Sequence, residues 1–169
     1  MLTRLVLAVT MLATAATAAT AQTTYFIVRH AERADAGKGG MGAGGTPNDP
    51  GLSPEGRTRA ASLAAMLKGT RLTAVFTTEF KRTQETAGPA ATAHGLTPTV
   101  VDADKTTALL EKLQAARGAV LVVGHSNTVP EVIAALGITD RVAIADTEFD
   151  NLFIVVSGER PTLITLKYK

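Results

Sequence analysis

The apolar run Val120 to Val123 constrains the fold more than any other segment of this sequence. Its side chains are apolar on both faces of a strand, so the strand has to be buried on both sides. The central strand of a parallel sheet covered by helices meets this requirement. A second apolar run, Tyr25 to Val28, also reads as a strand. We therefore expect an α/β fold built on a mostly parallel sheet.

Both apolar runs are followed by a histidine. Arg29-His30 comes after the first run and Gly124-His125 after the second, in a chain that has three histidines in all. In an open α/β sheet, the side chains just past the carboxyl ends of the strands converge on one crevice. We therefore expect His30 and His125 to meet there, although they lie far apart in the sequence.

Strand-like and helix-like segments alternate along the rest of the chain. Ser53-Pro54-Glu55 predicts a helix start, because serine is a good N-cap and proline suits the first helical position. The expected helices span about 54–68, 80–94, 106–117 and 128–136, and the further expected strands span 73–76, 99–101, 151–156 and 162–167. This order predicts a three-layer α/β/α sandwich with a mostly parallel central sheet and an antiparallel C-terminal hairpin.

The first 21 residues have the pattern of a secretory signal peptide. One positive charge, Arg4, precedes a short apolar stretch, and small residues lead to Ala21. The apolar stretch is too short to span a membrane. We expect cleavage near Ala21, a periplasmic or secreted protein, and a single domain over residues 22–169 with no membrane span. The alternatives are an uncleaved anchor and a wrongly assigned start of the chain.

The composition excludes several classes of function. The chain has 17 Lys and Arg against 15 Asp and Glu, so no basic face for nucleic acid is expected. It has no cysteine, which excludes cysteine nucleophiles, thiolate metal sites and disulfides. Stability must therefore come from packing alone.

A long glycine-rich loop is expected from Ala34 to Gly51. Loops of this length often serve as lids or binding loops, and a plain surface insertion is the equal alternative. The loop and its flank offer only Arg33 and Lys38 as cations for a second charged group on a ligand. We therefore expect an open and weakly selective pocket.

Polar groups follow three of the expected strands, at Arg29-His30, at Thr77 to Arg82 and at His125 to Asn127. Arginine suits a tetrahedral oxyanion, because its planar guanidinium donates two parallel, charge-assisted hydrogen bonds. A neutral imidazole beside such arginines can attack phosphorus and form a covalent intermediate. The positive charge of the pocket then offsets the developing phosphoryl charge without a metal ion.

Four segments along the chain combine these polar groups with a strand end or a helix start. They are Val28-Arg29-His30-Ala31-Glu32, Leu52-Ser53-Pro54-Glu55-Gly56, the stretch from Thr77 to Ala87, and Gly124-His125-Ser126. In this order they resemble the motifs of the histidine phosphatase superfamily, which includes cofactor-dependent phosphoglycerate mutases and many phosphatases. The resemblance spans nearly all of the chain after the signal segment and indicates a small member without a cap domain and with the phosphoglycerate mutase-like fold.

The resemblance implies a role for each matching residue. His30 would be the nucleophile that becomes phosphorylated, and Arg29 and Arg82 would bind phosphate oxygens. His125 would complete the cluster and stabilise the group in transfer. Separately, Ser126 and Asn127 stand at an expected helix start, where they can cap the helix or contact phosphate; we expect Asn127 mainly to cap.

The sequence departs from the family pattern at the proton donor. Acid phosphatase members place an aspartate directly after the second histidine, where this chain has Ser126. Mutase-like members use a glutamate from the segment that follows the second arginine, and that segment here offers Asp102 and Asp104. Asp102 is therefore our first candidate for the acid, and Glu32, close to the nucleophile in sequence, is the second. Ala31 stands where many members have glycine, and its extra methyl group need not block the pocket.

The expected activity is hydrolysis of phosphomonoesters or related phosphoryl compounds through phospho-His30, with no metal and no cofactor. The expected partners are a small phosphorylated substrate and a phosphate or sulfate ion, and not nucleic acid. The alternative is a non-catalytic module that binds phosphate or a phosphoglycan. A phosphoglycerate mutase-type phosphotransferase ranks below both, because the chain lacks the length to enclose a bisphosphorylated intermediate.

Overall fold

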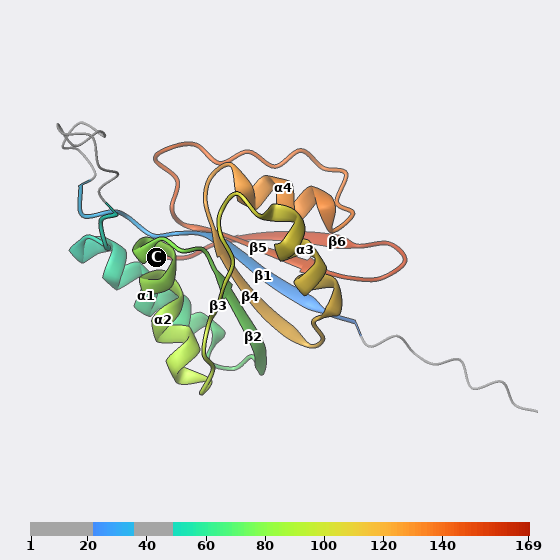
Figure 1. The fold of residues 1–169 in the computed structure, drawn as a ribbon, viewed down its shortest axis with the longest axis horizontal. Helices are drawn as coiled ribbons and strands as arrows, with labels where there is room; N and C mark the ends of the chain where they lie inside the picture. Colours follow the sequence, from blue (N-terminus) through green and yellow to red (C-terminus); the bar gives the residue numbers. More distant parts are fainter. Residues whose placement is uncertain (1–21, 36–48) are drawn as a thin grey trace, which may run out of the picture.

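The computed structural model describes residues 22–35 and 49–169, in which six strands form one sheet in the order β3-β2-β4-β1-β5-β6 (Figure 1). The strands are β1 (Thr24–Arg29), β2 (Leu72–Thr77), β3 (Thr99–Val100), β4 (Ala119–Gly124), β5 (Asn151–Val156) and β6 (Thr162–Lys167). The helices are α1 (Pro54–Leu67), α2 (Lys81–Ala93), α3 (Thr106–Ala115) and α4 (Thr128–Ala135). The expected alternation of strands and helices is confirmed.

Four neighbouring strands of the sheet are parallel, and two are not. β3, β2, β4 and β1 pair in parallel, whereas β5 runs antiparallel to β1 and pairs with β6 as an antiparallel hairpin. In the register of β1 with β4, Arg29 lies opposite Gly124, and the His30 N–H continues the ladder to the Gly124 carbonyl at 2.9 Å. The carboxyl ends of the two apolar runs are therefore adjacent.

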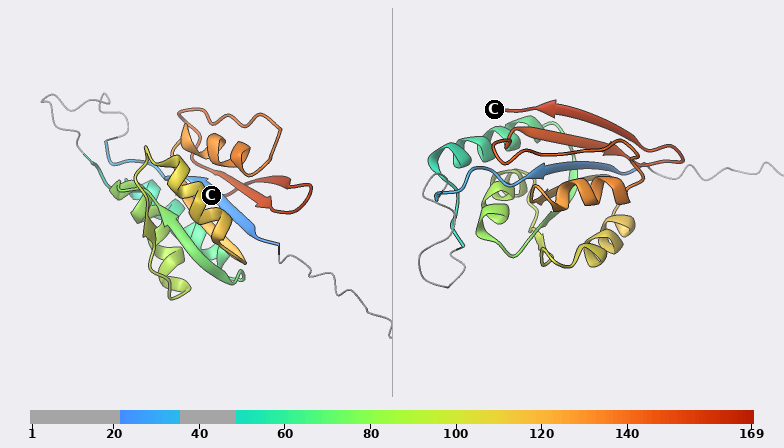
Figure 2. Two further views of the ribbon diagram at one scale, coloured as in Figure 1. Left: turned by 45° about the vertical axis from the view of Figure 1, so that its right-hand side comes forward. Right: turned by 90° about the horizontal axis from the view of Figure 1, so that it is seen from above.

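Helices cover both faces of the sheet (Figures 1 and 2). Ile27 of β1 belongs to an apolar cluster with side chains of α3 and α4, and its neighbour Val28 belongs to a second cluster with side chains of α1 and α2. In β4, Val120 and Leu121 point to these opposite clusters and are both fully buried. The three-layer α/β/α sandwich and the double burial of the central strand are confirmed.

The helix ends follow local chemistry in most cases. Ser53 caps α1, because its Oγ accepts a hydrogen bond from the Gly56 N–H at 3.1 Å. The expected helix at 106–117 ends two residues early, because Ala116 is extended and Gly118 has a φ of 87°. His94, at the end of α2, lies 2.9 Å through Nδ1 from the Ala90 carbonyl, which fits a helix-capping contact.

The start of α4 differs from the expectation for Asn127. This residue is helical in its own backbone, and its side chain makes no capping hydrogen bond. Oγ1 of Thr128, the first residue of α4, accepts a hydrogen bond from the His125 N–H at 3.0 Å, which ties the chain before the helix to its first turn but caps no helical N–H. The capping role expected of Asn127 is therefore wrong.

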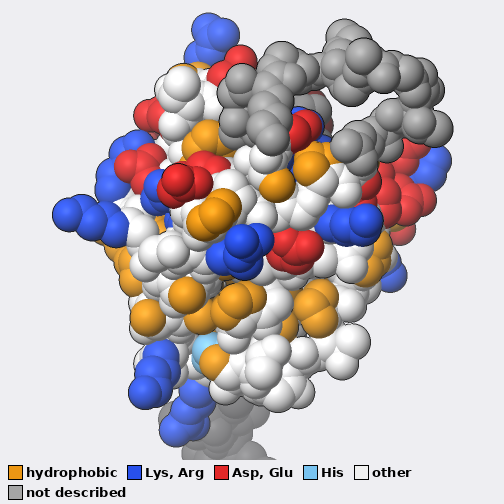
Figure 3. Space-filling view, turned by 90° about the vertical axis from the view of Figure 1, so that its left-hand side faces the viewer, with side chains coloured by type: hydrophobic (Ala, Val, Ile, Leu, Met, Phe, Trp, Pro, Cys, Tyr) orange, Lys and Arg blue, Asp and Glu red, His pale blue; other side chains and the backbone are white. Residues whose placement is uncertain are grey.

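Two expectations concern parts of the chain outside the described residues. The signal peptide of residues 1–21 and residues 36–48 of the glycine-rich loop, including Lys38, are not described, so both expectations stay predictions. Among the residues that are described, no helix has the length and apolar character needed to cross a membrane. The face drawn in Figure 3 mixes basic and acidic side chains.

Candidate active site

His30 and His125 lie side by side at the carboxyl ends of β1 and β4. Their ring centroids are 5.4 Å apart and their planes are inclined by 63°. Both side chains are buried, with 4% and 7% of their surface exposed. The meeting of the two histidines, expected from the strand ends alone, is confirmed.

The imidazole of His30 has a defined tautomer. Its Nδ1 lies 2.8 Å from the Ala31 carbonyl oxygen, which can only accept a hydrogen bond, so Nδ1 carries the proton. The lone pair is then on Nε2. Burial, and further the positive charges of Arg82 and Arg29, lower the pKa of His30 to about 3. The ring is therefore neutral at pH 7 and available as a nucleophile through Nε2.

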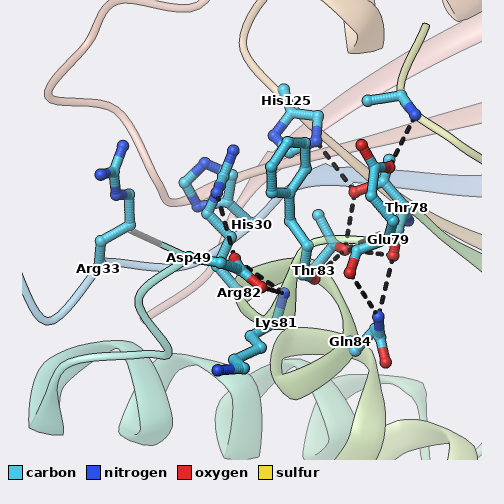
Figure 4. A network of polar contacts seen from close by, with 12 residues as sticks. His30, Arg33, Asp49, Thr78, Glu79, Lys81, Arg82, Thr83, Gln84 and His125 are labelled. Atoms are coloured by element: carbon cyan, nitrogen blue, oxygen red, sulfur yellow. Dashed lines mark hydrogen bonds and ion pairs between the residues drawn. The ribbon is translucent and has the colours of Figure 1, made fainter. Parts of the chain in front are cut away.

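His125 is held by a threonine from the neighbouring strand end. Its Nε2 lies 3.0 Å from Oγ1 of Thr78, and the same oxygen lies 3.0 Å from Oγ1 of Thr83 (Figure 4). Burial, followed by the charges of Arg82 and Arg29, lowers the pKa of His125 to about 4. Thr78 belongs to the stretch singled out in the sequence, but its contact with His125 was not predicted.

Arg29 is fixed by the segment that precedes β5. Its Nη1 donates to the backbone carbonyls of Ala145, Asp146 and Glu148 at 2.9, 3.0 and 3.1 Å. Its guanidinium also stacks on the ring of Phe149, 4.1 Å from the centroid. The Nε atom is buried and has no protein partner, so it is a donor available to an anion.

Arg82 has a similar arrangement on the other side of the site. Its guanidinium stacks on Phe80 at 4.1 Å, and its Nη1 lies 3.7 Å from Oδ1 of Asp49. Its Nε is also buried without a protein partner. Burial, and next the charge of Arg33, lower the pKa of Arg82, as expected where several cations converge. Sequence reasoning found Arg82 but not Asp49.

Threonine and glycine positions of the motifs connect the nucleophile to the helices. Oγ1 of Thr86 accepts a hydrogen bond from the Ala31 N–H at 2.9 Å and donates to the Arg82 carbonyl at 2.6 Å. A Cβ at Gly56 would collide with the Glu32 carbonyl, so glycine lets α1 approach the chain that leaves β1. The Ala31 methyl packs in a small apolar cluster with Leu52 and Ala60.

Glu32 is directed into an ion pair. Its carboxylate accepts hydrogen bonds from Arg59, at 2.9 and 3.0 Å from Nε and 2.6 Å from Nη2. Burial favours the protonated form, but the hydrogen bonds and charge of Arg59 outweigh it and lower the pKa of Glu32. Glu32 therefore stays ionised at neutral pH, and this geometry argues against it as the proton donor.

Asp102 lies in the turn between β3 and α3, at the same end of the sheet as the histidines. It is exposed and lines a narrow pocket together with Thr78 and Thr106. The turn is held in place by Glu79, whose Oε2 accepts a hydrogen bond from the Ala103 N–H at 2.8 Å. Asp102 thus lies at the carboxyl edge of the sheet and has access to solvent.

Ser126 and Asn127 follow His125 at the beginning of α4. Ser126 is half-buried and Asn127 is exposed. Their contact with phosphate stays a prediction. Within residues 22–35 and 49–169, no group of three or more His, Asp or Glu side chains is placed to hold a metal ion.

The arrangement is suited to a tetrahedral oxyanion. Three arginines, Arg29, Arg33 and Arg82, each lower the pKa of His125 through their charge, so all three act on one small volume. Buried guanidinium donors and neutral imidazoles together bind and polarise phosphoryl oxygens. The site therefore has the groups needed to bind phosphate and to form a bond to phosphorus.

The chain has sequence and structural similarity to known proteins. The model of the histidine phosphatase superfamily (branch 1) matches residues 25–105. No curated protein matches the chain by sequence. The solved structures that share its fold include the protein histidine phosphatase SixA in complex with tungstate, with 18% identity and a TM-score of 0.65 over 85% of this chain and 96% of that one.

Two further solved structures extend the comparison. A putative alpha-ribazole-5'-P phosphatase from Escherichia coli has 16% identity and a TM-score of 0.67, over 86% of this chain and 96% of that one. A phosphoglycerate mutase from Bacillus anthracis has 14% identity and a TM-score of 0.67, over 86% of this chain and 93% of that one. At these identities the likeness establishes the phosphoglycerate mutase-like fold.

Proposed function

Because the chain belongs to the histidine phosphatase superfamily, we propose that it is a metal-independent phosphatase that hydrolyses phosphomonoesters through a phosphohistidine at His30. One observation carries this proposal. His30 is a neutral imidazole whose Nδ1–H is bound to the Ala31 carbonyl, with its lone pair on Nε2 in a cluster of arginines. This is the protonation state that a nucleophilic histidine needs.

The reaction follows from this geometry in two steps. Nε2 of His30 attacks phosphorus, the bond from phosphorus to the ester oxygen breaks, and the departing alkoxide takes a proton. Arg29, Arg82 and His125 bind the phosphoryl oxygens and offset their charge. A water molecule then attacks phosphorus, the P–Nε2 bond breaks, and inorganic phosphate leaves.

We assign the proton transfers to Asp102 and not to Glu32. Glu32 is held as a carboxylate by Arg59, whereas Asp102 is solvent-exposed in the β3–α3 turn. Asp102→Asn tests the assignment with two substrates. Loss of a general acid lowers kcat by about 100-fold for an alkyl phosphate and changes little for para-nitrophenyl phosphate, whose leaving group needs no proton. Equal loss on both substrates would contradict the assignment.

A non-catalytic phosphate-binding module remains the second candidate. It is favoured by the absence of any aspartate directly after His125, where Ser126 stands. The mycobacterial glucosyl-3-phosphoglycerate phosphatase solved with inorganic phosphate has the same fold, with a TM-score of 0.62, 15% identity, and coverage of 85% of this chain and 95% of that one. That complex supports a phosphate pocket here and does not distinguish catalysis from binding.

The deciding experiment is hydrolysis of para-nitrophenyl phosphate by the purified protein with a chelator present. We expect turnover, together with an acid-labile phosphate on the denatured enzyme that disappears in His30→Ala. Phosphate binding without turnover on any phosphoester would favour the binding module. A label that persists in His30→Ala would remove His30 as the nucleophile.

The proposed site of action is outside the cytoplasm, with residues 1–21 removed as a signal peptide and residues 22–169 forming the single domain. The support is the pattern of one Arg, a short apolar stretch and small residues before Ala21. Cell fractionation followed by N-terminal sequencing tests it. We expect a first residue of Gln22, and an intact Met1 in the mature protein would refute the cleavage.

A further inference from the structure

The start of α2 lacks a cap from its own sequence. Phe80 stands at the N-cap position and makes no side-chain hydrogen bond. Asp49, which is distant in sequence, supplies the missing acceptor, because both of its carboxylate oxygens lie 3.1 Å from the Lys81 backbone N–H. A negative charge is also favoured at this end of a helix. Asp49 is thus bound at the first turn of α2.

The same carboxylate faces the guanidinium of Arg82. Oδ1 of Asp49 lies 3.7 Å from Nη1 of Arg82, a separation at which charge attraction acts without a hydrogen bond. The ring of Phe80 supports the flat face of the guanidinium at 4.1 Å. Figure 4 shows Asp49 between Lys81 and Arg82, close to the site of His30. Arg82 is therefore restrained on two sides, while its Nε has no protein partner.

The position of Asp49 is itself fixed by the chain that follows it. The Leu52 N–H donates to Oε2 of Glu85 at 2.7 Å, one turn further along α2. The Gly51 carbonyl accepts a hydrogen bond at 3.0 Å from the Ala34 N–H, in the chain that leaves β1. The segment that carries Asp49 is therefore attached both to the helix of Arg82 and to the chain of the nucleophile.

We propose that Asp49 is a positioning residue that holds Arg82 in its phosphate-binding orientation before the substrate arrives. An arginine side chain has many rotamers, and ordering it on binding would weaken the complex. With Asp49 and Phe80 in place, this ordering occurs on folding, so the phosphoryl group meets a guanidinium that is already oriented. Asp49 itself need not touch the substrate. The proposal rests on the phosphatase function proposed above.

Asp49→Asn is the sharpest test, because asparagine keeps an oxygen that can accept from the Lys81 N–H and loses only the charge. We expect kcat/KM for para-nitrophenyl phosphate to fall by about tenfold, with an equal weakening of inorganic phosphate binding and an unchanged melting temperature. Asp49→Glu should recover part of the loss. The matched control is Asp104→Asn, which removes the same charge from an exposed pair with Lys105 and should leave kcat/KM, phosphate binding and the melting temperature unchanged.

A double-variant cycle shows whether the effect passes through Arg82. The affinity for inorganic phosphate is measured by calorimetry in Arg82→Ala with and without Asp49→Asn, and we expect no further loss from the second change. A full additional loss would overturn the proposal, and so would phosphate binding in Asp49→Asn that equals or exceeds that of the unchanged protein. Because the readout is binding, a protein without turnover would refute the phosphatase function and still test the role of Asp49.

Discussion

The two buried histidines should make the protein progressively less stable in mild acid. In the unfolded chain a histidine has a pKa near 6.5, whereas the folded protein lowers the pKa of His30 to about 3 and of His125 to about 4. Between these values the unfolded state binds more protons than the folded state. The free energy of unfolding therefore rises with pH through this window. The contribution of the two histidines is fully present above pH 6.5 and is lost as the pH falls.

The size of the effect follows from the shifts. A pH of 5 lies about 1.5 units below the unfolded-state pKa of histidine and above both folded-state values. Each pH unit in this range lowers the free energy of unfolding by about 1.36 kcal/mol per histidine. This corresponds to about 2 kcal/mol for each histidine, or about 4 kcal/mol for His30 and His125 together between pH 8 and pH 5. A loss of this size is a large share of the 5 to 15 kcal/mol typical of a folded domain.

Urea unfolding at pH 8, 7, 6 and 5 measures this dependence, in buffers free of phosphate and sulfate so that no anion occupies the site. In His30→Asn and in His125→Asn, the difference between pH 8 and pH 5 should shrink by about 2 kcal/mol each. Values at pH 8 serve as the reference for each variant. If the double variant retains the full pH dependence of the unchanged protein, the histidines are not held neutral by burial and by the arginines, and the reasoning fails.

Three further substitutions test other parts of the structure. Glu32→Gln should change kcat for para-nitrophenyl phosphate by no more than about threefold. The loss of the ion pair with Arg59 should lower the free energy of unfolding by about 1 to 3 kcal/mol. A loss of kcat of about a hundredfold would instead indicate a catalytic role for Glu32. Thr78→Val keeps the shape of the side chain but removes the 3.0 Å contact to Nε2 of His125, and it should lower kcat by about tenfold. Full activity in this variant would show that the contact is dispensable. Leu121→Ala leaves a cavity at the fully buried middle of β4 and should lower the free energy of unfolding, measured in urea, by about 2 to 5 kcal/mol. A loss below about 1 kcal/mol would contradict the burial of this strand on both faces.

Features that depend on a short stretch of chain were predictable from the sequence. The run at Val120 to Val123 was expected to form a central strand buried on both faces, and the structure has it inside the sheet, between β2 and β1. The two histidines were expected to meet, because parallel strands end at the same edge of a sheet. In the same way, Ser53 before Pro54 marked a helix start that the structure has at that residue.

Contacts between distant segments were not predictable in this way. Arg29 is oriented by carbonyl groups of residues 145, 146 and 148, and no side-chain pattern marks a backbone acceptor. Asn127 has the sequence signature of a cap, yet its own backbone is already helical and its side chain makes no capping hydrogen bond. Both cases depend on backbone direction, which the tertiary structure decides.

The choice between Asp102 and Glu32 as the proposed proton donor depends on where the chain leads each carboxylate. Glu32 is two residues from the nucleophile, but the chain turns after β1, where Arg33 bridges to Leu52 and the Ser53 N–H binds the Glu32 carbonyl at 2.9 Å. These contacts bring Glu32 to α1 and to Arg59. Asp102 is far along the chain, but the parallel pairing of β3 with β2 returns it to the strand end of Thr77 and Thr78. The topology of the sheet therefore brings Asp102 to the same edge as His30 and His125, and this placement supports it as the proposed donor.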